Sequence, residues 1–308
     1  MKKLIAVFMI GLVLPFTASA EKTPCGGGNG GISHCEGSKF VCNNGKTSGT
    51  KKICSGYIKK KPVKNKPAHV DIDITNTETV KKTEITKLGN VLKLDYQGFT
   101  LWLDCEKRSV VKFQYNVQHG TGNEPGAKGF MLDPSVPKEC QQTGTAVYGH
   151  GYDRGRLVPA NHLDYSAEAM KQTNYMTNIL PQTLQMKRGA WLLTEEIIEC
   201  YRDIDELSVI GGVIWGENPA DDYFVKSHGV KTPDAFWKVV IRGTGQDEQA
   251  IAWVVPNSKD ATQKHLDNYL VTLGELEIIT GEKIPVANYV KNDKPSVSWI
   301  IPAECKRR

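Results

Sequence analysis

Eight cysteines constrain the fold of this 308-residue chain more than any other feature. All of them follow an N-terminal segment typical of a secretory signal, with Lys2 and Lys3, an apolar run over residues 4–16 and the small residues Ala18 and Ala20. An even number of cysteines in an exported chain predicts disulfides. We expect the first four to pair among themselves and the last four to staple the remainder: Cys25, Cys35, Cys42 and Cys54, then Cys105, Cys140, Cys200 and Cys305.

Two alternatives to an exported, disulfide-bonded chain stay open. A zinc site is disfavoured because no two cysteines have the two-residue spacing typical of structural zinc. An uncleaved membrane anchor is disfavoured because the apolar run over residues 4–16 is short for a membrane span. No later segment is long and apolar enough to cross a bilayer, so we expect a periplasmic or extracellular protein without a transmembrane segment after signal removal.

Composition divides the chain into four parts. Residues 1–20 are the expected signal peptide, and residues 21–57 are a Gly- and Cys-rich module with too few large apolar residues to build a core without disulfides. Within this module Asn43–Gly45 predicts a hairpin turn. Residues 58–69 alternate Lys with Pro, which is typical of an extended linker. Residues 70–308 are long enough for one sizeable domain.

The net charge of +5 is unevenly distributed along the chain. Residues 21–68 contain ten lysines against Glu21 and Glu36, a balance of +8. Once Lys2 and Lys3 are also subtracted, residues 69–308 carry about −5. The basic N-terminal arm is suited to nucleic acid, anionic lipid or anionic surface polymers. The alternative is that it only keeps the chain soluble.

Hydrophobic periodicity beyond residue 69 predicts an α+β fold, with sheets and helices packed on them. Strands are expected at 69–75, in a series over 91–117 with a turn at Gln97-Gly98, and at 206–216, 235–243 and 250–257. Residues 189–204 have apolar side chains at helical spacing and predict a helix. Residues 166–180 favour helix or loop, and a further helix is expected within 264–281.

Four motifs in the large domain carry a specific resemblance: "YDRGRLVPANH" (152–162), "TNYMTNILPQTLQMKRGAW" (173–191), "TEEIIECYRD" (194–203) and "VIGGVIW" (209–215). In this order they resemble the DNA/RNA non-specific endonuclease family, over roughly residues 70–308. The resemblance implies a ββα-metal (His-Me finger) nuclease fold with a central antiparallel sheet and packed helices. It also implies DNA or RNA as the partner, Mg²⁺ as the cofactor, and phosphodiester hydrolysis as the reaction.

Two positions depart from the family pattern. The family has a general-base histidine where this chain has Arg156, and a guanidinium cannot accept a proton near neutral pH. The family has a metal-binding asparagine where this chain has Lys187, whose ammonium has no lone pair for Mg²⁺. Both cations can still hold a phosphate.

Other matching positions keep the family residue type. The resemblance implies that Arg154 contacts phosphate and that Glu195 occupies the position of a glutamate that orients metal-bound water. Asn178 and Gln182 match a block that the family uses near the site, and Arg188 adds a cation for substrate binding. We expect these residues to gather around Arg156 and Lys187.

Neither flanking histidine is expected to replace the missing base. His150 and His162 each lie six residues from Arg156, which is roughly 20 Å along an extended strand. The resulting hypothesis is an exported family member with impaired hydrolysis. A pseudonuclease that binds nucleic acid without cleaving it, and a surface or structural module, remain as alternatives.

Overall fold

The computed structural model describes residues 25, 32–36, 39–42, 44–49, 83–117, 122, 124–217 and 219–305. They belong to two compact units, residues 1–76 and residues 77–308. The predicted signal peptide, the Lys/Pro linker, the strand expected at 69–75 and Cys54 lie outside the described residues.

The first unit contains a small antiparallel hairpin, formed by β1 (Ile32–Glu36) and β2 (Lys39–Cys42). A turn follows β2, where Gly45 has a φ of 80° and its amide donates to the Cys42 carbonyl at 2.9 Å. This confirms the turn predicted at Asn43–Gly45. A disulfide joins Cys25 to Cys42, as expected for cysteines that pair within the first four.

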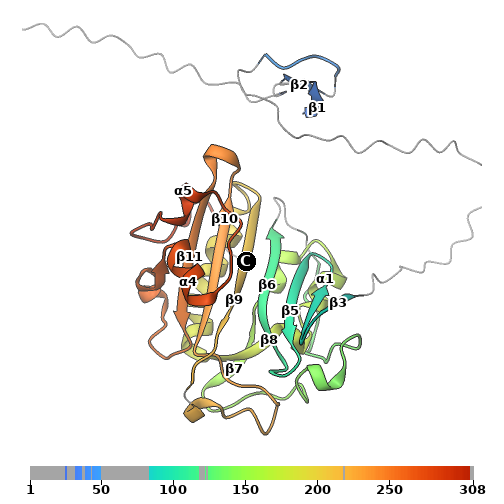
Figure 1. Ribbon diagram of the computed structural model, residues 1–308, viewed down its shortest axis with the longest axis vertical. Coiled ribbons are helices and arrows are strands. Elements are labelled where there is room, and N and C mark those ends of the chain that lie inside the picture. The colour runs from blue at the N-terminus through green and yellow to red at the C-terminus, as the bar shows by residue number, and fades with distance from the viewer. Residues whose placement is uncertain are drawn as a thin grey trace, which may run out of the picture. The chain divides into compact units, whose positions relative to one another are not determined.

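The second unit is built on an eight-stranded antiparallel sheet in the order β12-β11-β10-β9-β6-β5-β4-β3 (Figure 1). A separate antiparallel pair, β7 and β8, lies outside this sheet. The strands are β3 (Glu84–Leu88), β4 (Val91–Asp95), β5 (Phe99–Asp104), β6 (Ser109–Val117), β7 (Tyr152–Arg156), β8 (Ile179–Thr183), β9 (Leu207–Ile214), β10 (Ala235–Arg242), β11 (Gln249–Pro256) and β12 (Leu270–Val271).

Helices cover both faces of the sheet. The α-helices are α1 (Ala167–Gln172), α2 (Leu184–Arg188), α3 (Ala190–Tyr201), α4 (Leu273–Thr280) and α5 (Asn288–Lys291). The 3₁₀ helices are Lys138–Cys140, Ala160–Leu163, Met176–Asn178, Pro219–Asp221, Gly245–Asp247 and Gln263–Tyr269. The α+β class with a central antiparallel sheet is thereby confirmed.

Successive side chains of the central strands point to opposite faces of the sheet and so contribute to two hydrophobic cores. On β9, Val209 belongs to the core that α3 covers, whereas the next residue, Ile210, belongs to the core that α4 and α5 cover. Phe236 and Trp237 divide in the same way on β10. Figure 1 shows α4 lying over β11 on its side of the sheet. Because successive strand residues face opposite sides, strands buried on both faces are mostly apolar.

Two disulfides staple the second unit, Cys105–Cys140 and Cys200–Cys305. This confirms the pairing expected among the last four cysteines. No free cysteine occurs in the described part of the chain. Among the same residues, no helix has both the length and the apolar character that crossing a membrane requires.

The stretch 166–180, expected to be helix or loop, is so over most of its length. It contains α1 and the 3₁₀ helix Met176–Asn178, and only Ile179 and Leu180 belong to a strand, β8. The strand forms because Ile179 to Thr183 pair with β7, a contact that is distant in sequence. The turn at Gln97-Gly98 is confirmed, with a φ of 89° at Gly98.

Candidate functional site

The strand pair β7–β8 and the two helices that follow it bring the family motifs together. The register pairs Asp153 with Gln182 and Arg156 with Ile179. Thr183 then caps α2, because its side chain accepts a hydrogen bond from the Met186 amide. Gly189 separates α2 from α3, so Lys187 and Glu195 come from two helices. This ββα arrangement places residues from all three elements around one cavity.

The cavity has a volume of about 450 Å³ and two kinds of wall. Three cations, Arg156, Lys187 and Arg188, lie with Glu195, Gln182 and Asn161 in its lining. The remaining wall is apolar and consists of Pro159, Ala160, Met170, Trp191 and Leu192. The structure therefore brings together five of the residues singled out in the sequence: Arg156, Gln182, Lys187, Arg188 and Glu195.

Arg156 is held by a residue that sequence reasoning missed. Its Nε and one terminal nitrogen donate to Asn174 Oδ1, at 3.0 and 2.5 Å. Asn174 is itself buried and donates to the Ala127 carbonyl. The Arg156 guanidinium also lies 4.9 Å from the ring centroid of Phe130. Burial lowers the pKa of Arg156, but a guanidinium still keeps its proton near neutral pH. Asn174 is neutral, so it orients Arg156 without compensating its charge.

Lys187 has a different partner, the carboxylate of Asp153. Lys187 Nζ donates to Asp153 Oδ2 at 2.6 Å, and the Arg154 amide donates to Asp153 Oδ1 at 2.8 Å. Burial raises the pKa of Asp153, but these hydrogen bonds outweigh it, so its pKa is lowered overall. Asp153 is therefore a carboxylate near neutral pH, and it compensates the charge of Lys187.

The Mg²⁺ implied by the resemblance does not fit this set of donors. Lys187 stands where the resemblance implies a metal ligand, and its ammonium would repel a cation instead of ligating it. The adjacent carboxylate, Asp153, already accepts hydrogen bonds from Lys187 and from the Arg154 amide. Glu195 is then the one carboxylate that lines the cavity, beside two further cations.

Glu195 interacts electrostatically with a buried lysine, Lys238, that sequence reasoning also missed. Lys238 is fully buried on β10, donates to Thr194 Oγ1 at 2.7 Å and lies 3.7 Å from the Trp191 ring centroid. Burial raises the pKa of Glu195, opposed by the charges of Lys238, Arg156 and Lys187. Burial lowers the pKa of Lys238 to about 8, opposed by Glu195. A lysine within the otherwise apolar run "AFWKVVI" was the signal, because lysine is rarely buried unless paired.

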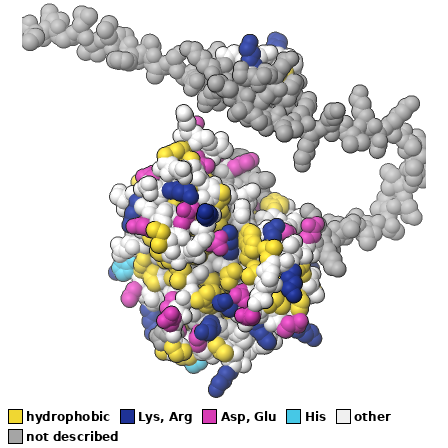
Figure 2. Space-filling model, in the orientation of Figure 1, with side chains coloured by type: hydrophobic (Ala, Val, Ile, Leu, Met, Phe, Trp, Pro, Cys, Tyr) yellow, Lys and Arg dark blue, Asp and Glu magenta, His cyan; other side chains and the backbone are white. Residues whose placement is uncertain are grey.

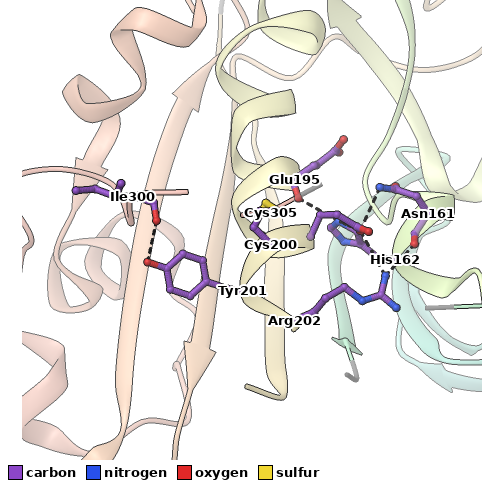
Figure 3. Close-up of a disulfide and its surroundings, with 9 residues drawn as sticks. Asn161, His162, Glu195, Cys200, Tyr201, Arg202, Ile300 and Cys305 are labelled. Atoms are coloured by element: carbon purple, nitrogen blue, oxygen red, sulfur yellow. Dashed lines mark hydrogen bonds and ion pairs between the residues drawn. A yellow bond between two sulfur atoms is a disulfide. The ribbon is translucent and has the colours of Figure 1, made fainter. Parts of the chain in front are cut away.

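His162 belongs to the support behind α3 rather than to the cavity. Its ring contacts the Tyr115 hydroxyl at 2.9 Å and the Glu195 carbonyl at 3.2 Å. Burial, reinforced by Lys238 and Arg202, lowers the pKa of His162 well below its usual value. Figure 3 shows this ring against the backbone of Glu195, with the Glu195 side chain directed away from it. His150 is stacked on Tyr223 and does not line the cavity.

Arg154 and Asn178, which were expected at the site, also lie outside the cavity lining. Arg154 donates to the Thr145 carbonyl at 2.8 Å and lies 4.3 Å from the Phe130 ring centroid. Asn178 is fully buried, and its amide bonds the backbone of Val158 and Thr173. Asn178 therefore joins the segment after β7 to the segment before β8, a structural role.

Gly155 is required by packing, not by backbone conformation. Its φ is not positive. Instead, a Cβ on Gly155 would lie 2.1 Å from Cδ of Gln182, which is fully buried. The absence of a side chain at Gly155 makes the room that Gln182 occupies.

We expect Gly155→Ala to lower the free energy of unfolding by about 1–3 kcal/mol, because the added methyl overlaps Gln182. Combining it with Gln182→Ala should recover part of that loss. Gly144→Ala is the matched control, since its Cβ would meet nothing within 4 Å. Urea unfolding measures these three variants together with Gln182→Ala alone and the unmodified protein. Additive losses in the double variant would contradict the proposed contact.

Comparison with known proteins identifies two families along this chain. The model of the DNA/RNA non-specific endonuclease family matches residues 76–293. A second family model, YdcA, matches residues 25–56. Over 56 residues the chain is 50% identical to the uncharacterized protein YdcA of Escherichia coli (strain K12), covering 98% of that protein and 18% of this chain.

The relatives of the large unit are nucleases. Mitochondrial nuclease EXOG of Xenopus laevis is 29% identical over 163 residues, which cover 49% of this chain and 46% of that protein. Nuclease C1 of Cunninghamella echinulata var. echinulata is 27% identical over 175 residues, covering 54% and 69%. The chain thus spans about half the length of the EXOG relative. A crystal structure of the EndoG/EndoGI complex shares the fold, with a TM-score of 0.52 and 20% identity over 63% of this chain and 85% of that one.

Proposed function

The chain belongs to the DNA/RNA non-specific endonuclease family, and from this premise we propose that it is an exported nucleic-acid-binding member whose hydrolytic activity is impaired at Arg156 and Lys187. The observation that carries the proposal is the cavity lining, where cations stand at both positions at which hydrolysis needs other chemistry.

Impaired hydrolysis follows from what the two side chains cannot do. A general base must accept a proton near the working pH, and Arg156 stays protonated. The family uses a divalent metal, but Lys187 places its own charge at the ligand position and is paired with Asp153 at 2.6 Å. Glu195 can accept a proton, but neither Arg156 nor Lys187 supplies a nucleophile that Glu195 could activate.

Binding is supported by the same cations. Arg188 is exposed, and no hydrogen bond or ion pair of its side chain occurs among the described residues, so its charge is available to a ligand. Arg156 adds a charge that Asn174 orients without neutralising it. On the face seen in Figure 2, lysine and arginine side chains of the large unit are interspersed with aspartate and glutamate. We attribute the attraction to phosphate to Arg156 and Arg188, which line the cavity.

The basic N-terminal arm, which comprises the module and the Lys/Pro linker, is proposed as a second contact. The balance of +8 over residues 21–68 attracts anionic polymers, including nucleic acid and surface polymers. Its disulfide Cys25–Cys42 and those of the large unit are typical of extracytoplasmic proteins, which supports export. The match to almost the whole of a small protein supports a module with a role separate from the nuclease-like unit.

Cleavage is tested with plasmid DNA and with RNA, in Mg²⁺ and in EDTA. The expected result is no Mg²⁺-dependent cleavage above the level of the Arg156→Ala variant. A nuclease preparation with known Mg²⁺ dependence serves as the assay control. Clear cleavage that requires Mg²⁺ would overturn the impairment.

Binding is tested by the affinity of the exported chain for a fluorescent oligonucleotide across a salt series. We expect affinity to fall steeply with salt, because bound phosphates release counterions. Arg188→Ala should weaken binding about threefold to tenfold and lower the logarithmic salt slope by about 1. Lys294→Ala, an exposed cation outside the cavity lining, is the control and should change neither. No binding at low salt would refute the proposed function.

A further inference from the structure

The cavity contains an unsatisfied polar group that the proposed function does not explain. Gln182 lines the cavity and is fully buried, yet neither its amide nitrogen nor its amide oxygen has a hydrogen-bond partner in the described structure. Buried amides are nearly always paired, because an unpaired group loses its bonds to water without replacement. A ligand with an adjacent donor and acceptor would satisfy both atoms.

The surroundings keep this amide in place. Gln182 packs over Gly155, whose missing side chain provides the space. Gln182 is paired with Asp153 in the β7–β8 register, and Asp153 forms the ion pair with Lys187. The amide is therefore fixed beside the cations, not free to turn toward water.

The two walls of the cavity match the two ends of a nucleotide. Arg156 and Arg188 suit a phosphate, whereas Met170, Trp191 and Leu192 offer apolar surface to a flat base. A volume of about 450 Å³ falls within the usual range of small-molecule pockets. The edge of a base carries a donor and an acceptor next to each other, and these are the hydrogen-bond partners that the Gln182 amide lacks.

Building on the proposed function, we propose that this cavity seats one unpaired nucleotide, with its phosphate on Arg156 and Arg188 and its base edge on Gln182. The ligand class is a nucleoside monophosphate or an unpaired nucleotide of a single strand. A base inside a duplex is stacked and cannot reach the cavity wall without leaving the stack. Single strands are therefore preferred to duplexes of the same length.

The test is calorimetric titration of the full chain with AMP, adenosine and inorganic phosphate. AMP should bind at least about tenfold more tightly than phosphate or adenosine, because only AMP engages both walls. Gln182→Met, which keeps the volume and removes the amide, should weaken AMP binding about tenfold and leave phosphate binding within about twofold. Gln185→Met, an exposed position on α2 outside the cavity lining, is the matched control and should change neither.

A second readout separates binding from folding. Gln182→Met should raise the melting temperature of the unliganded protein by about 2–4 °C, because it removes the unpaired buried amide. Equal affinities for AMP and phosphate, or an unchanged AMP affinity in Gln182→Met, would overturn the nucleotide seat. If salt-dependent oligonucleotide binding persists in that case, the proposed function survives. Conversely, AMP binding without any oligonucleotide binding would refute the proposed function alone.

Discussion

Replacing two side chains, Arg156→His together with Lys187→Asn, is expected to create Mg²⁺-dependent cleavage of DNA and RNA at least about a hundredfold above the unmodified protein. Histidine can accept a proton near neutral pH, and general-base catalysis alone contributes about 10²–10⁴-fold. An asparagine oxygen is a ligand that Mg²⁺ accepts. Removing the Lys187 ammonium also releases the Asp153 carboxylate from its ion pair. Digestion of plasmid in Mg²⁺ and in EDTA measures the gain.

The single replacements are the informative controls for this experiment. Arg156→His alone keeps the ammonium of Lys187, and Lys187→Asn alone keeps the guanidinium of Arg156, so each should gain little. Adding Glu195→Gln to the double variant should remove most of the gain, because Glu195 is the one carboxylate in the cavity lining. If the double variant stays inactive while binding nucleic acid normally, the defect does not rest on these two positions.

Removing the disulfide Cys200–Cys305 is expected to give the largest loss of stability of any single change discussed above. It joins cysteines 105 residues apart, and chain entropy predicts about 5 kcal/mol for a loop of that length. The double variant Cys200→Ala with Cys305→Ala should lose about that amount in the free energy of unfolding, measured by denaturation in urea. The loss extends to the site, because Cys200 belongs to α3, the helix that carries Glu195.

The second disulfide of the large unit provides the comparison. Cys105–Cys140 spans 35 residues, so Cys105→Ala with Cys140→Ala should lose about 4 kcal/mol. The C-terminal segment also keeps other contacts with the end of α3, since the Tyr201 hydroxyl donates to the Ile300 carbonyl and Tyr201 packs on Trp299. A larger loss for the shorter loop would show that native contacts, not chain entropy, determine how much each disulfide stabilises the protein.

Much of the fold was predictable because local patterns agree with the tertiary structure. The helix expected at 189–204 is α3, and the apolar runs at 206–216, 235–243 and 250–257 are β9, β10 and β11. In contrast, Ile179 to Thr183 form a strand only because β7 pairs with them. Local composition carries no information about such a partner. The expected division between signal, module, linker and large domain stays a prediction.

The site was predictable in its chemistry but not in its partners. The motif order indicated Arg156, Gln182, Lys187, Arg188 and Glu195, which line one cavity. It also indicated Arg154 and Asn178, whose side chains bond to nearby backbone instead. Asn174 and Lys238 were missed, because their roles depend on contacts 18 and 44 residues away in sequence.

By itself the sequence determined which chemical groups this site can contain. A guanidinium at Arg156 and an ammonium at Lys187 cannot act as base and metal ligand in any conformation, because their protons and charges belong to the side chains themselves. Only the tertiary structure decided what those charges face. It pairs Lys187 with Asp153, orients Arg156 on Asn174 and leaves the Gln182 amide unsatisfied in the cavity, since packing across β7, β8, α2 and α3 sets the partners that each group meets.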